Sequence, residues 1–215
     1  MPHRRLTPRR LAAAATRPIR HLPDRRAAVR AAAAVAAACP GEVRVCWDLD
    51  NTLVDSGRLL REGVPLDEAV RSADPVAGML DFQRALAAAL PGAGHFVLSV
   101  RARGMRDDTL AWIARHGLEL APDAVALVRS PADKPAVWRA LARGGKLVVV
   151  DDLSHGHEGS AITPYGRLAE QARRIADAYV DLAAIGAIAE EPASAAAAAE
   201  RVAAAVGGAA SPSAS

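Results

Sequence analysis

Four short apolar segments, each separated from the next by a stretch long enough for a helix, constrain the fold most strongly. Residues 43–47, 95–98, 124–128 and 146–150 are rich in β-forming residues and bounded by polar or glycine-rich sequence. Strands that alternate with helices favour a parallel sheet covered by helices on both faces. The sequence therefore predicts an α/β domain, a three-layer Rossmann-like sandwich around a central parallel sheet.

Capping residues, prolines and glycines predict where the helices lie. Asp74-Pro75 and Thr163-Pro164 each place a capping residue before a proline, which is typical of a helix start. Gly117 and Gly144-Gly145 are typical of helix ends. The expected helices span residues 66–72, 74–90, 107–116, 135–143 and 163–178, with a further one ending near Val206.

Charge and composition divide the chain into three parts. Residues 1–40 form a basic leader with nine arginines and one acid, a net charge of +8, whereas the whole chain carries only +3. Such an arm is either a solvated extension, disordered or helical in part, or a binding segment for nucleic acid, acidic lipid or an acidic protein. Residues 41–192 form the predicted α/β domain. Residues 193–215 are rich in alanine and serine, and we expect a helix followed by a disordered end from Gly207 to Ser215.

The sequence shows no membrane-spanning or export segment and no metal-binding cysteine pattern, and these observations predict the cellular location and the redox state of the cysteines. No apolar run is long and uncharged enough for membrane insertion, and Arg17, Pro18 and Arg20 interrupt the only stretch similar to an export signal. A cytoplasmic protein is therefore expected. Cys39 and Cys46 fit no metal-binding spacing and are expected to be reduced thiols.

Two carboxylates follow the first predicted strand directly. In an open parallel sheet, ligands bind at the carboxyl ends of the strands, where Asp48 and Asp50 would lie. Asp48 can attack phosphorus and form an acyl-phosphate, while Asp50 can protonate the leaving group and then activate water. Paired acids also cap helices or bind calcium, so this pattern is interpreted only together with the other strand ends.

The other strand ends supply a cation site and donors for a phosphoryl group. Asp151-Asp152 follows the fourth strand, and such carboxylates can hold Mg²⁺, although an aspartate there can also cap a helix. Ser99 ends the second strand and can donate a hydrogen bond to a phosphoryl oxygen. Lys134 is one of only two lysines among 27 basic residues, at a place where a compact charge suits phosphate.

His155 and His157 follow the acidic pair and raise the possibility of a zinc site. No third nitrogen or sulfur ligand is evident, so we expect both to be solvent-exposed loop histidines, one of which could touch substrate.

The order of these motifs resembles that of the haloacid dehalogenase-like (HAD) hydrolase superfamily. The resemblance covers residues 43–178 and rests on Asp48-x-Asp50-x-Thr52, Ser99, Lys134 and the Asp151-Asp152 pair. It implies a Rossmann-like core, an aspartyl-phosphate on Asp48, and Mg²⁺ held by Asp48, Asp151, Asp152 and the backbone carbonyl of Asp50. Thr52, Ser99 and Lys134 would bind the phosphoryl group. An aspartate at position 50 resembles the phosphatase pattern, because dehalogenation needs no protonated leaving group.

Substrate choice in this superfamily comes largely from inserted cap domains, and no large cap fits between residues 53 and 74 or between 99 and 134. An open site favours a large phosphorylated substrate. Ser99-Val100-Arg101 is similar to the phosphatase half of polynucleotide kinase-phosphatases, where an arginine contacts the phosphate. A nucleic-acid 3′-phosphate is one hypothesis, and a small-metabolite phosphatase or phosphotransferase is another. A non-catalytic binding protein of the same fold, recruited through its basic leader, is a third.

Overall fold

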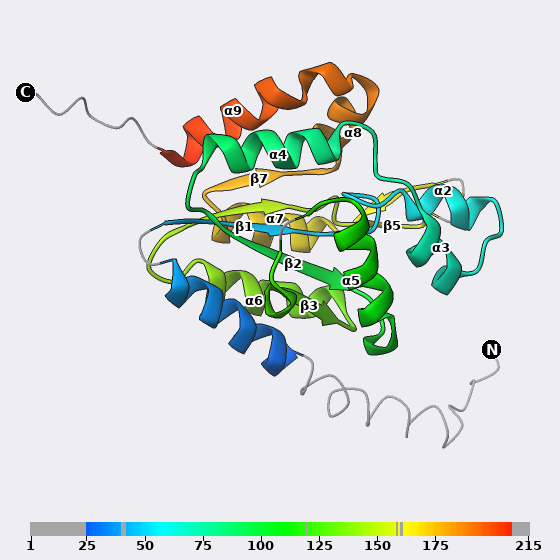
Figure 1. Ribbon diagram of the computed structural model, residues 1–215, viewed down its shortest axis with the longest axis horizontal. Coiled ribbons are helices and arrows are strands. Elements are labelled where there is room, and N and C mark those ends of the chain that lie inside the picture. Colours follow the sequence, from blue (N-terminus) through cyan, green and yellow to red (C-terminus); the bar gives the residue numbers. More distant parts are fainter. Residues whose placement is uncertain (1–24, 40–41, 119, 158, 160, 208–215) are drawn as a thin grey trace, which may run out of the picture.

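A five-stranded parallel sheet forms the centre of the molecule. The structure is a computed structural model that describes residues 25–39, 42–118, 120–157, 159 and 161–207. The strand order is β3-β2-β1-β4-β7, and every neighbouring pair is parallel. Their bounds are β1 Val43–Trp47, β2 Gly94–Val100, β3 Val125–Val128, β4 Lys146–Val150 and β7 Ala178–Val180. This confirms the predicted α/β class with a Rossmann-like sheet (Figure 1).

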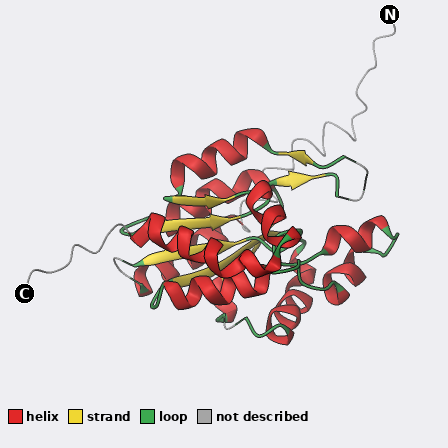
Figure 2. Cartoon of the chain, turned by 90° about the horizontal axis from the view of Figure 1, so that it is seen from above, coloured by secondary structure: helices red, strands yellow, loops and turns green. Residues whose placement is uncertain are grey.

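Helices cover both faces of this sheet, as Figure 2 shows from above. One face packs against α4 (Met79–Ala89), α5 (Arg106–Arg115), α8 (Leu182–Glu190) and α9 (Ala195–Gly207). The other face packs against the helix of residues 25–38, α6 (Lys134–Leu141) and α7 (Gly166–Ile175).

Alternation along the central strand explains the two layers. Val45 and Trp47 of β1 belong to the first core, and Cys46 between them belongs to the second. Because successive side chains of a strand point to opposite faces, an unbroken apolar strand must be covered on both sides.

The helix of residues 25–38 belongs to the folded body. Ala28 and Ala32 are buried in the second core. The buried Arg44 side chain donates from Nη2 to the carbonyl oxygens of Ala36 and Cys39, at 2.8 and 2.7 Å. Residues 1–24 of the predicted leader and residues 208–215 of the predicted tail lie outside the described residues, and the divisions at residues 40 and 192 stay predictions.

Two predicted helix starts are wrong. Residues near Asp74-Pro75 run extended beside residues 53–55, with Val54 bridging Pro75, and α4 begins only at Met79 after Gly78 at a φ of 72°. Thr163-Pro164 forms strand β6, which pairs antiparallel with β5 (Ser154–His155), and α7 begins at Gly166. In both places pairing with a distant segment overrides the local cap-and-proline signal.

The remaining predicted elements agree closely with the structure. Strands β1 and β4 have the predicted bounds, and β2 extends past Ser99 to Val100. Helix α3 spans Leu66–Ser72 as predicted, and α9 confirms the helix expected near Val206. Sequence reasoning missed α2 (Ser56–Arg61), α8 and β7. Among the described residues, no helix combines the length and apolar character needed to cross a bilayer.

Candidate active site

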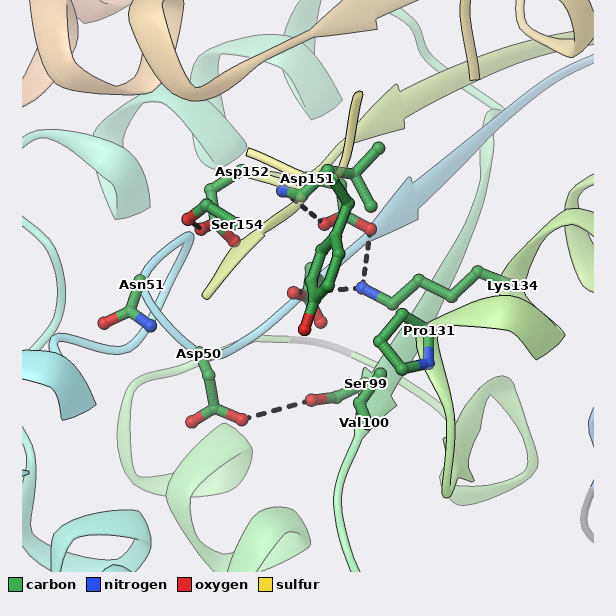
Figure 3. A pocket seen from close by; sticks show the side chains of 12 residues that line it. Asp50, Asn51, Ser99, Val100, Pro131, Lys134, Asp151, Asp152 and Ser154 are labelled. Carbon is green, nitrogen blue, oxygen red and sulfur yellow. Dashed lines mark hydrogen bonds and ion pairs between the residues drawn. The ribbon is translucent and has the colours of Figure 1, made fainter. Parts of the chain in front are cut away.

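Side chains from three adjacent strands and one helix meet at the carboxyl edge of the sheet. They surround a cavity of about 210 Å³. Asp48 follows β1, Ser99 lies near the end of β2, and Lys134 begins α6. Asp151 and Asp152 follow β4 (Figure 3). The cavity is lined by Asp48, Asp50, Asn51, Ser99, Val100, Pro131, Lys134, Asp151, Asp152, Leu153, Ser154 and Tyr165.

Lys134 links two of the strand ends. Its Nζ donates to Asp151 Oδ2 at 2.6 Å and lies 3.1 Å from Asp48 Oδ2, and its side chain is buried. Burial alone would lower the pKa of Lys134, but the charges of Asp151 and Asp48 outweigh burial and raise it. The lysine is therefore a permanent positive charge between two carboxylates.

Three buried carboxylates form a candidate cation site. Oxygen atoms of Asp48, Asp151 and Asp152 lie within 4.8 Å of one another. Burial raises the pKa of Asp48, and the neighbouring carboxylates raise it further, although Lys134 opposes them. The single positive charge of Lys134 therefore does not neutralise the three carboxylates.

Asp48 Oδ1 provides the test of whether a cation fits. This oxygen is buried and has no hydrogen-bond partner among the residues that the structure describes, although buried acceptors are normally satisfied. An all-oxygen set of carboxylates suits a hard divalent cation such as Mg²⁺. The residues present therefore fit the predicted ion.

Asp50 lies apart from the carboxylate cluster and is held by Arg101. Arg101 Nε donates to Oδ2 at 2.7 Å and Nη2 to Oδ1 at 2.8 Å, while Ser99 Oγ donates to Oδ2 at 3.3 Å. Burial would raise the pKa of Asp50, but the charge and hydrogen bonds of Arg101, with those of Ser56 and Ser99, lower it overall. Asp50 is consequently ionised.

Thr52 and Arg101 do not line the cavity in which the sequence predicts they bind phosphate. Thr52 Oγ1 accepts from the backbone N–H of Asp152 at 3.1 Å and donates to Asp152 Oδ1 at 3.4 Å. The remaining nitrogen of Arg101, Nη1, donates to Thr109 Oγ1 at 3.0 Å. In this arrangement both residues hold aspartates of the site, and their predicted contact with phosphate stays a prediction.

The expected exposure of both histidines is wrong for His157. His157 is 8% exposed, and its Nε2 lies 2.6 Å from Ser154 Oγ and 3.1 Å from Asp152 Oδ2. His155 is exposed as expected, with its ring 4.8 Å from that of Tyr165.

Sequence reasoning also missed Asn51, Ser154 and Tyr165, which line the cavity. Asn51 has a φ of 60° and accepts from the backbone N–H of Gly57 at 2.8 Å. The signal available for Asn51 was its residue type, since asparagine tolerates the left-handed region. Ser154 begins β5 and Tyr165 follows β6, two strands that the sequence did not predict.

A small flap, helices α2 and α3, stands beside the cavity. Both helices lie at the same end of the molecule as β5 (Figure 1). A second hollow of about 410 Å³ shares Asp50, Asn51, Val100 and Tyr165 with the cavity and also contacts Leu60 and Leu66 of the flap. Two short helices are the whole insertion between β1 and α4, in keeping with the expectation of no large cap.

No family model, no curated protein and no solved structure matches this chain.

Proposed function

We propose that this protein is a magnesium-dependent phosphatase that hydrolyses phosphomonoesters through an aspartyl-phosphate on Asp48, in the manner of the HAD hydrolases that its motifs resemble. The observation that supports the proposal most directly is the environment of the two Asp48 carboxylate oxygens. Its Oδ2 lies beside Lys134, and its Oδ1 is buried next to two further carboxylates, with no hydrogen-bond partner in the described part of the chain. Buried carboxylate oxygens are usually hydrogen-bonded, so an unpaired oxygen that faces a cavity supports a ligand or cation there.

In the first half-reaction an oxygen of Asp48 attacks phosphorus, and the bond from phosphorus to the ester oxygen breaks with its electron pair on that oxygen. Lys134, 3.1 Å from Asp48, offsets negative charge as the phosphoryl group approaches. Mg²⁺ bound by Asp48, Asp151 and Asp152 would reduce the repulsion between the nucleophile and the phosphoryl oxygens. Ser99 lines the cavity, and its hydroxyl, which donates to Asp50 in this structure, would turn to donate to one of those oxygens.

In the second half-reaction water attacks phosphorus, the bond from phosphorus to the Asp48 oxygen breaks to release phosphate and restore the carboxylate, and Asp50 is the candidate base. Its ion pair with Arg101 favours the carboxylate form, which can take the proton of the attacking water. The same ion pair opposes the protonated form that the acid role in the first step requires. Esters whose alcohols leave readily are therefore the substrates that this geometry favours.

Different leaving groups distinguish the candidate substrates. All three side-chain nitrogens of Arg101 face acceptors within the protein, so Arg101 adds no support to the hypothesis of a nucleic-acid 3′-phosphate. A substrate screen distinguishes the remaining alternatives, which are a small phosphorylated metabolite, a phosphotransfer reaction and a binding role through the basic leader. The screen compares phosphorylated metabolites, nucleotides, phosphopeptides and oligonucleotide ends, with the Asp48→Asn protein as blank.

The decisive test is the covalent intermediate. With Mg²⁺ and p-nitrophenyl phosphate, the wild-type protein should turn over, lose activity in EDTA and regain it with Mg²⁺. Mass spectrometry after acid quenching should locate a phosphoryl group on Asp48. Asp48→Asn should abolish both signals, while Asp81→Asn, at an exposed site on α4, should abolish neither. Turnover by Asp48→Asn would refute the assignment of the nucleophile, and rescue by zinc alone would refute the choice of metal.

A further inference from the structure

His157 contacts Asp152, one of the three carboxylates, although the sequence predicts it to be an exposed loop histidine. Asp152 Oδ2 receives Ser154 Oγ–H and also lies 3.1 Å from His157 Nε2. Its other oxygen, Oδ1, accepts from Thr52 Oγ1. Donors on both oxygens fix the plane of the Asp152 carboxylate.

The contacts of His157 also assign its proton. Asp152 Oδ2 only accepts hydrogen bonds, so Nε2 must carry hydrogen to face it favourably. Ser154 has one hydroxyl hydrogen, which it donates to Asp152, and its oxygen remains free to accept from His157 Nε2 at 2.6 Å. With its hydrogen on Nε2, His157 shares that single N–H between Asp152 Oδ2 and Ser154 Oγ, while the hydroxyl hydrogen of Ser154 points to Asp152.

The flap holds the backbone of His157 from the other side. Arg61, at the end of α2, donates from Nη1 to the carbonyl oxygen of His157 at 3.0 Å. Gly57 of α2 approaches so closely that a Cβ there would lie 2.9 Å from His157 Cβ. The histidine is thus fixed between the flap and the cation site.

We propose that His157 is the positioning residue of the cation site: it orients Asp152 for the metal and is itself held by flap helix α2. This inference rests on the proposed metal site. Donors behind a metal ligand set its direction and its basicity, and their loss typically lowers metal affinity by about 10- to 100-fold.

The test measures Mg²⁺ binding to the full chain by calorimetry, without substrate. His157→Leu keeps a bulky side chain but removes the donor, and we expect Mg²⁺ affinity to fall by about 10-fold or more. His157→Gln offers an amide N–H near the position of Nε2 and should retain most of the affinity. His155→Gln, on the same hairpin but exposed, should bind Mg²⁺ like the wild type. Arg61→Leu should weaken binding less than His157→Leu, because it acts only through the backbone of His157.

The outcomes separate this inference from the proposed function. A wild-type protein that binds no Mg²⁺ would overturn both. Wild-type binding together with unchanged affinity in a folded His157→Leu protein would overturn the positioning role alone, as would equal losses in His157→Gln and His157→Leu. Should His157→Leu fail to fold, Ser154→Ala removes the other donor to Asp152 Oδ2, and undiminished Mg²⁺ affinity there would likewise overturn the positioning role.

Discussion

Arg101 grips Asp50 through both carboxylate oxygens, with Nε 2.7 Å from Oδ2 and Nη2 2.8 Å from Oδ1. Two parallel hydrogen bonds from a planar guanidinium fix the direction of a carboxylate as well as its charge. Arg101 in turn is 5% exposed and is held by Thr109 of α5. The position of the proposed base therefore depends on Arg101 and, through Arg101, on Thr109 of helix α5.

Replacing Arg101 should weaken the fold in a graded way. Arg101→Met leaves the Asp50 carboxylate without its main donors, and we expect the free energy of unfolding to fall by about 2 kcal/mol. Arg101→Lys should recover only part of this, because one ammonium group cannot span both oxygens. Urea denaturation gives the values. The double variant Arg101→Met/Asp50→Asn tests the ion pair itself. If its loss of unfolding free energy equals the sum of the losses in the two single variants, the ion pair contributes nothing to stability.

Asp48→Asn should stabilise the metal-free protein while it abolishes turnover. Three buried carboxylates share one lysine, so the removal of one negative charge should raise the free energy of unfolding by about 1 kcal/mol in EDTA. With Mg²⁺ the order should reverse, because the wild type gains more from binding the ion. Thermal melts with and without Mg²⁺ compare the two proteins. An equal shift in both would count against the metal site.

His95 should make the fold less stable in mild acid. Trp47 Nε1 donates to His95 Nδ1 at 3.0 Å, and burial lowers the pKa of His95 below its ordinary 6.5. The unfolded chain therefore takes up a proton on His95 at a higher pH than the folded protein does. Stability is fully present above the unfolded pKa and is lost as pH falls below it toward the folded value.

His95→Gln should remove this component and flatten the pH dependence of the unfolding free energy between about pH 7 and 5. His155→Gln, at an exposed position, serves as the control. Urea denaturation at several pH values measures the slope. Identical slopes for His95→Gln and the wild type would rule out His95 as the source.

Two glycine-to-alanine changes should shift stability in opposite directions. A Cβ at Gly57 would lie 2.4 Å from Asn51 Oδ1, so Gly57→Ala should cost about 1–3 kcal/mol as side chains are forced apart. A Cβ at Gly186 of α8 meets nothing within 4 Å, so Gly186→Ala should add about 0.5–1 kcal/mol. Thermal melts of both variants measure the contrast. An unchanged melting temperature in Gly57→Ala would show that helix α2 and the Asn51 side chain can move apart at little energetic cost.

Two truncations should separate the basic arm from the fold. Removal of residues 1–24 should leave the melting temperature nearly unchanged if the arm acts only in binding. Removal of residues 1–39 also deletes the buried Ala28 and Ala32 and the carbonyls that receive Arg44, and should cost about 3 kcal/mol or more. An equally stable protein lacking residues 1–39 would show that this helix does not support the domain.

Local sequence patterns predicted the main strands of the central sheet but not the small β5–β6 hairpin. Residues 43–47 and 146–150 were recognisable because a buried strand needs a short apolar run, whatever its neighbours are. Thr163-Pro164 has the local pattern of a helix start, yet it pairs with Ser154-His155 across a loop. The energy of that pairing depends on contacts that no local pattern contains.

The candidate site likewise contains residues that the sequence predicts and contacts that it does not. Asp48, Ser99, Asp151 and Asp152 are predictable because strand ends share one edge of a parallel sheet, and Lys134 because lysine is rare in this chain. The environment of His157 depends on Arg61, which is 96 residues away in sequence, and the grip of Arg101 on Asp50 spans 51 residues. Side-chain orientation at such distances follows from tertiary packing, so residue type alone indicated neither.

Strand β1 occupies the middle of the sheet, with β2 on one side and β4 on the other. Fraying of an outer strand such as β3 or β7 would leave the ladder between the three inner strands intact. Amide hydrogens of β1 should accordingly exchange with solvent among the slowest in the chain. Asp48 and Asp151 would thus keep their spacing during partial opening of the molecule.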